Sequence, residues 1–135
     1  MATQALAPRE SQALRIRGMK VTVQSQNGDP VLLRVEGRVS QRDVEVDDPF
    51  VDSVGENVYS RQVVVDLSEV ASLDSSGVNW LLVSQKRMHE HGGKLVLHSL
   101  SPIANNVLKV LNLHAVFQIA DSEAAAIRKL GGNDR

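Results

Sequence analysis

The run Asp74-Ser75-Ser76-Gly77 holds the residue types best suited to chemistry in this sequence. It lies between an apolar stretch that predicts a buried strand, Val63–Leu67, and a stretch with helical spacing, Val78–His91. In an open α/β sheet, functional groups gather just beyond the carboxyl ends of the strands. Asp74 suits the N-cap, which places both serines in the first turn, where free backbone N–H groups favour an anion.

A phosphate on Ser75 would meet two opposing effects. The backbone N–H groups of the first turn would receive it. The carboxylate of Asp74 would lie beside its charge of about −1.5 to −2. We therefore expect the modification to be tolerated structurally while it changes what the surface binds.

Two other interpretations of the same residues remain open. Asp, Ser and Gly also form ordinary capped helix starts. A serine hydrolase would need Gly-x-Ser-x-Gly around its nucleophile, whereas Leu73 and Asp74 precede Ser75 here. The chain also lacks the Gly-x-x-x-x-Gly-Lys-Ser/Thr loop that cradles phosphates. We expect no enzyme activity and no catalytic residue.

Metal and cofactor sites find little support in the sequence. There is no cysteine, so thiolate ligands and disulfides are excluded. His89 and His91 are two residues apart on a predicted helix and point to different faces, and His98 and His114 add no pair with ligand spacing. We expect no metal and no cofactor.

Trp80 falls on the side of its predicted helix away from Val78, Leu82 and Met88. An exposed Trp at this place would be a partner-binding anchor, because Trp is enriched at interface hot spots. Packing against a neighbouring helix is the equal alternative.

The composition limits the classes of function. The chain of 135 residues has a net charge of −1, which gives no overall attraction to nucleic acid or to an anionic membrane. Only 3% of its residues are aromatic, too few for base stacking, so the core must be aliphatic. No apolar run approaches the roughly 20 residues of a membrane span, and no signal peptide is recognisable. We expect a soluble cytoplasmic protein.

The patterns predict alternating strands and helices after a flexible tail over residues 1–18. Strands are expected at Met19–Ser25, Val31–Val39, Val63–Val65, Lys94–Ser99 and Ala115–Ala120, with Asn27-Gly28 as a hairpin turn. Asp66 begins a polar connection, DLSEVASLD, that leads to Asp74.

Helices are expected to begin at three further caps. Asp48 precedes Pro49, Ser101 precedes Pro102, and Asp121 opens the last helix, which Gly131-Gly132 ends. Gly92-Gly93 ends the helix after Asp74. The helical stripes predict inward side chains: Phe50, Val51, Val54 and Val58 in the first helix, and Ile103, Val107, Val110 and Leu111 in the third.

The resulting order is β-β-α-β-α-β-α-β-α. Strands that alternate with helices imply parallel pairing, and the opening hairpin adds an antiparallel edge. We therefore predict one α/β domain over residues 19–132 with a mixed, mostly parallel sheet.

The ordered motifs of residues 63–127 resemble the STAS domain family of bacterial anti-sigma factor antagonists. They comprise a buried strand ending in Asp-Leu-Ser, the Leu73-Asp74-Ser75-Ser76-Gly77 signature, a helix ending in Gly92-Gly93, KLVLHSLSP, a Leu-rich helix and an acidic cap. This combination is far more specific than the signature alone. Residues 19–59 suit the same fold without a distinctive motif.

The resemblance implies a phosphorylation switch at Ser75. In the family, the first serine after the Asp is phosphorylated by a serine kinase that is also the anti-sigma factor. The unphosphorylated form binds that kinase, phosphorylation breaks the complex, and a phosphatase of PP2C type restores it. The partner-binding residues would be Asp74, Ser76, Gly77, Asn79 and Trp80.

The chain departs from the family pattern at Asn79, at Trp80 and in the acidic segment of residues 40–48, which leaves the partner's identity open. The alternative function is a STAS scaffold of a stress-signalling assembly, or an accessory subunit of a lipid-transport ATPase, without a phosphorylation switch. The oligomeric state stays open.

Overall fold

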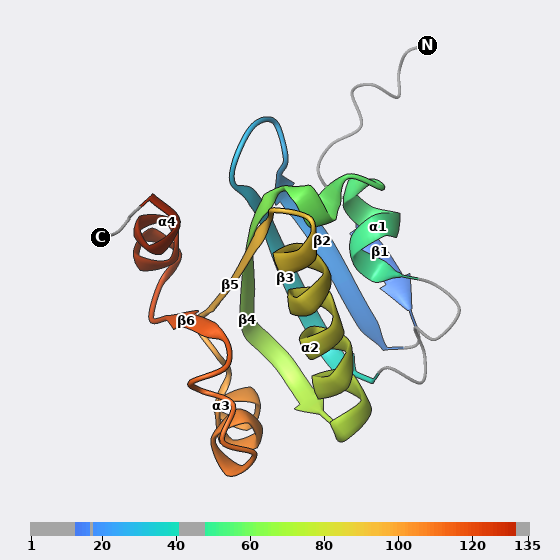
Figure 1. The fold of residues 1–135 in the computed structure, drawn as a ribbon. Helices are drawn as coiled ribbons and strands as arrows, with labels where there is room; N and C mark the ends of the chain where they lie inside the picture. The colour runs from blue at the N-terminus through green and yellow to red at the C-terminus, as the bar shows by residue number, and fades with distance from the viewer. Residues whose placement is uncertain (1–12, 17, 41–47, 132–135) are drawn as a thin grey trace.

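The computed structural model describes residues 13–16, 18–40 and 48–131, which form one six-stranded sheet with helices on both faces (Figure 1). The strands lie in the order of the chain: β1 (Ala13–Ile16), β2 (Met19–Ser25), β3 (Val31–Val39), β4 (Gln62–Leu73), β5 (Lys94–His98) and β6 (Gln118–Ala120). β1, β2 and β3 pair antiparallel, and β3 to β6 pair parallel. The predicted mixed sheet, opened by a hairpin, is therefore confirmed.

The strand β1 is an addition to the predicted order. Residues 13–16 were expected in the flexible tail, yet their backbone pairs with β2 from Ala13 opposite Thr22 to Ile16 opposite Met19. Leu14 and Ile16 alternate with Arg15, a strand pattern too short to stand out by itself. Residues 1–12 and 17, the rest of the expected tail, lie outside the described residues.

Four helices and one 3-10 turn connect or follow the strands: α1 (Pro49–Val54), η4 (Val58–Ser60), α2 (Ser75–Glu90), α3 (Pro102–Val110) and α4 (Glu123–Gly131). Alternate residues of β4 point to opposite faces of the sheet, so Val63, Val65 and Leu67 pack with residues of α1, α2 and α3. Val64 packs instead with α4. Three helices thus cover one face and α4 covers the other. Val58, expected in the first helix, is buried in η4 instead.

Most predicted helix caps are confirmed. Asp48 accepts hydrogen bonds from the backbone N–H of Phe50 and Val51, and the hydroxyl of Ser101 accepts one from Ala104. The predicted cap at Asp121 is wrong by one residue, because Ser122 Oγ accepts from the backbone N–H of Ala125 and Ser122 O from that of Ala126.

The polar connection expected from Asp66 is wrong, because β4 continues to Leu73. Its second half pairs with the end of β3, with Gly37 opposite Val70 and Val39 opposite Leu73. Val70 and Leu73 are buried there, while Ala71 between them is exposed and Ser72 is half-buried. β4 is therefore 12 residues long beside the five of β5, and its carboxyl end runs on past the end of β5 while it stays paired with β3 (Figure 1).

The predicted inward stripe of α3 is also wrong. The helix packs through Ala104 and Leu108, which are fully buried, and Val107 packs only partly. Ile103, Val110 and Leu111 are exposed, Val110 by 69%. Because the side of α3 that carries Ala104 faces the core, the larger side chains of Ile103 and Val110 face solvent.

A polar contact joins α1, η4 and α2. The hydroxyl of Tyr59 donates to Asp48 Oδ2 at 2.5 Å, and Arg87 Nη1 approaches the same oxygen at 3.2 Å. Burial and the neighbouring Asp48 carboxylate raise the pKa of Tyr59 to about 12. This cluster holds the C-terminal half of α2 in place.

Candidate functional site

The site is built around the first turn of α2, just after the carboxyl end of β4. Asp74 is the N-cap, as predicted: its backbone is extended, and its Oδ1 accepts a hydrogen bond from the backbone N–H of Gly77 at 2.8 Å. The side chain also accepts a 2.6 Å hydrogen bond from the hydroxyl of Ser76.

Gly77 lets α2 begin in contact with the end of β3. A Cβ on this residue would lie 2.4 Å from the carbonyl oxygen of Val39, far closer than such atoms approach. The backbone N–H of Asp74 donates to the same oxygen at 3.3 Å. The motif glycine thus permits the close approach that fixes where the two serines lie.

The two serines of the motif have different surroundings. The hydroxyl of Ser76 donates to Asp74 and lies 3.1 Å from Ser40 Oγ, so it links the cap of α2 to the residue after β3. Ser75 is exposed, and no described residue forms a hydrogen bond or ion pair with its side chain. Ser76 therefore joins the cap of α2 to the end of β3, whereas the side chain of Ser75 is exposed.

The charge of the site comes from Asp74. The hydrogen bond from Ser76 lowers the pKa of Asp74 below its ordinary value, helped by the backbone N–H of Gly77 and by Ser40. The carboxylate is therefore negative at neutral pH. The backbone N–H of Gly77, which could otherwise receive a phosphate, is already engaged by this carboxylate.

Trp80 is buried rather than an exposed anchor. Its side chain is only 6% exposed, and its ring stacks on that of Phe50 in α1 with centroids 4.9 Å apart. Packing on a neighbouring helix, the alternative left open by the sequence, is what the structure shows. Asn79, one residue before, is exposed beside the motif.

Ser40 joins this site through a contact that sequence reasoning did not predict. Its hydrogen bond to Ser76 depends on β3 and β4 ending side by side, which no local pattern reveals. Ser40 begins the acidic segment of residues 40–48, whose departure from the family pattern left the partner's identity open. Residues 41–47 of it lie outside the described residues, and its last member, Asp48, caps α1.

Among residues 13–16, 18–40 and 48–131, no group of three or more His, Cys, Asp and Glu side chains gathers to hold a metal ion. Within the same ranges, no helix is both long and apolar enough to cross a bilayer. At the start of α2, the exposed hydroxyl of Ser75 follows directly after the carboxylate of Asp74.

The sequence of the chain matches that of a known protein family. The family described as "Mlab, STAS domain" matches residues 21–119, well over half of the chain. The chain belongs to the STAS domain family. Over 66 residues it is 32% identical to BtrV of Bordetella bronchiseptica, named as a candidate anti-sigma factor antagonist. That match covers 49% of this chain and 57% of BtrV, so the chain spans little more than half of this relative.

Solved structures share the fold of this STAS domain. A STAS domain protein of Planctomyces limnophilus has a TM-score of 0.64 at 22% identity, covering 87% of this chain and 98% of that one. The unphosphorylated anti-sigma factor antagonist SpoIIAA has a TM-score of 0.60 at 18% identity, covering 90% and 100%. Phosphorylated SpoIIAA from Bacillus has a TM-score of 0.53 at 19% identity, covering 86% and 99%.

Proposed function

We propose that this STAS domain is an anti-sigma factor antagonist that binds an anti-sigma factor and is released when Ser75 is phosphorylated. One observation carries the proposal: Ser75 is exposed at the start of α2, while the neighbouring Ser76 is held by Asp74 and Ser40. A kinase can reach the first hydroxyl without breaking the cap that the second one maintains.

Phosphorylation would change the charge of the surface more than its shape. A phosphate on Ser75 would add about −1.5 to −2 charges next to the carboxylate of Asp74. Because Asp74 already holds the N–H of Gly77, that amide offers little compensation. A partner packed over this helix start would have to desolvate two adjacent negative groups, which costs several kcal/mol.

The proposed partner is an anti-sigma factor that is itself a serine kinase, with a PP2C-type phosphatase reversing the modification. The contact surface comprises Asp74, Ser75 and Asn79, which are all exposed. Gly77 and Trp80 are buried and act indirectly, because their contacts with Val39 and Phe50 position α2. The STAS domain itself carries out no catalysis and works in the cytoplasm.

The experiment is phosphorylation by candidate kinases from the same genome with ATP, followed by intact mass measurement. One phosphate should be added to the wild type and to Ser76→Ala, and none to Ser75→Ala. Ser76→Ala is a matched control, because it removes the adjacent hydroxyl from the same turn. Phosphate on Ser75→Ala would disprove the assignment, and no phosphate on any variant would favour the scaffold or accessory-subunit function.

A further inference from the structure

A cavity of about 580 Å³ lies between α2, β5, β6 and α4, remote from Ser75. It exists because β6 is short. β6 pairs with Val96, Leu97 and His98 of β5, which leaves Lys94 and Leu95 without a partner from that strand. α2 and α4 cover opposite faces of the sheet, so both flank this open edge of β5.

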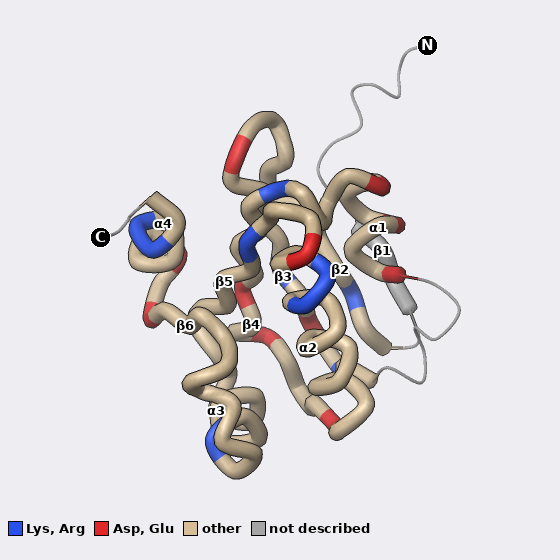
Figure 2. The backbone as a smooth tube through the Cα atoms, viewed as in Figure 1, with Lys and Arg blue, Asp and Glu red and all other residues tan. Residues whose placement is uncertain are grey.

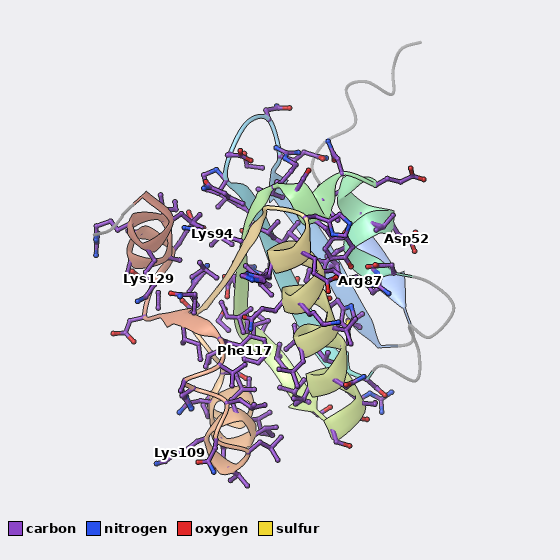
Figure 3. All side chains as sticks on the ribbon, in the orientation of Figure 1. Asp52, Arg87, Lys94, Lys109, Phe117 and Lys129 are labelled. Carbon is purple, nitrogen blue, oxygen red and sulfur yellow. The ribbon has the colours of Figure 1, made fainter. Side chains whose placement is uncertain are left out.

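The lining of the cavity is mostly apolar and basic, with Gln85, His89 and Gln118 as its other polar side chains. Leu82 of α2, Leu95 of β5 and Leu130 of α4 line it, together with Lys94 and Lys129. Figure 2 shows basic residues both at the start of β5 and on α4, and Figure 3 labels Lys94 at β5 and Lys129 at α4. No aspartate or glutamate of the described residues lines it.

The two lysines are available to a ligand. Neither Lys94 nor Lys129 forms an ion pair with a described residue, whereas Lys86 at the same rim is paired with Glu90 at 3.3 Å. The cavity therefore presents two positive charges that no described residue pairs, next to the side chains of Leu82, Leu95 and Leu130. Its volume lies in the range of about 300–1,000 Å³ that is usual for small-molecule sites.

We propose that this cavity binds a free monocarboxylate with a medium-length alkyl chain. The chain would lie against Leu82, Leu95 and Leu130, where each buried methylene strengthens binding by up to about fourfold. The carboxylate would lie between Lys94 and Lys129. The site is separate from Ser75, so it stands whether or not Ser75 is phosphorylated.

The probe is decanoate, titrated by calorimetry into the full chain below its micelle concentration. Saturable binding should tighten from octanoate to decanoate, and 1-decanol, which has the same chain length without the charge, should bind at least tenfold more weakly. In amide NMR spectra, decanoate should shift the signals of Lys94 and Lys129 and leave that of Ser75 unchanged.

Charge-reversal variants test the rim. Lys94→Glu and Lys129→Glu should each weaken decanoate binding about tenfold, because an attraction becomes a repulsion. Lys109→Glu, on α3 away from the cavity, is the matched control and should bind as the wild type does. A urea unfolding midpoint near that of the wild type shows that each variant is folded.

Several results would overturn the proposal. These are no saturable binding, equal affinity for 1-decanol, or an equal loss in Lys109→Glu. Binding to phosphatidylglycerol vesicles without binding to decanoate would identify a lipid surface as the ligand instead. If no other alkyl carboxylate displaces bound decanoate, the association is adventitious.

Discussion

Replacing Gly77 by alanine tests how the start of α2 is held. In an ordinary helix this change stabilises a protein by about 1 kcal/mol, because glycine is a poor helix former. Here the new Cβ would lie 2.4 Å from the carbonyl oxygen of Val39, a backbone atom that cannot rotate away. Because the contacted atom belongs to the backbone, we expect the cost to lie in the upper part of the usual range for overpacking, at about 2–3 kcal/mol. We therefore expect a net loss of about 1–2 kcal/mol.

The measurement is urea unfolding followed by the fluorescence of Trp80, the single tryptophan, which stacks on Phe50. With a slope near 2 kcal/mol per molar urea, the midpoint should fall by about 0.5–1 M. Gly131→Ala, in a helix with nothing within 4 Å of the new Cβ, is the control and should not fall. A Gly77→Ala protein as stable as the wild type would refute the close approach.

Three further predictions concern single side chains. Ser76→Ala should lower the free energy of unfolding by about 1 kcal/mol, because Asp74 and Ser40 lose a hydrogen-bond partner, whereas Ser75→Ala should change it by less than about 0.5 kcal/mol in the same urea titration. Trp80→Ala should cost about 3–5 kcal/mol as a buried truncation, and Trp80→Phe, which keeps a ring against Phe50, should cost clearly less in calorimetric melting; equal losses would refute the stacking. The pKa of Tyr59 is raised to about 12 in the folded state, above an unfolded value near 10, so its contribution to stability is complete below pH 10 and is lost as the pH rises toward 12. Tyrosinate absorbance should show the late titration, and Tyr59→Phe should flatten that part of the stability curve; a titration near pH 10 would contradict the contact with Asp48.

The sequence predicts the parts of the fold that depend on local pattern. The strands Met19–Ser25 and Val31–Val39 and the caps at Asp48, Asp74 and Ser101 are found where expected. Each depends on alternation or on a side chain that reaches its own backbone. The accessible serine at the start of α2 follows from the same cap.

Features that depend on contacts between distant segments were not predicted. β4 runs on to Leu73 because β3 pairs with it, although its own residues read as a polar connection. The spacing of Ile103 and Val110 fits a stripe of core residues, yet α3 packs against the core through Ala104 and Leu108 instead. The sequence did not decide whether Trp80 is exposed or buried, because its neighbour Phe50 lies on α1, far away in the sequence.

The central claim is that charge on Ser75 controls binding. Its most direct test is the affinity of an anti-sigma factor kinase for the wild type before and after phosphorylation, with Ser75→Asp as a stable mimic and Ser75→Ala as the uncharged control. We predict tight binding by the unmodified chain and by Ser75→Ala, and a loss of at least tenfold for the phosphorylated chain and for Ser75→Asp. Equal affinity for the unmodified and phosphorylated chains would contradict the account.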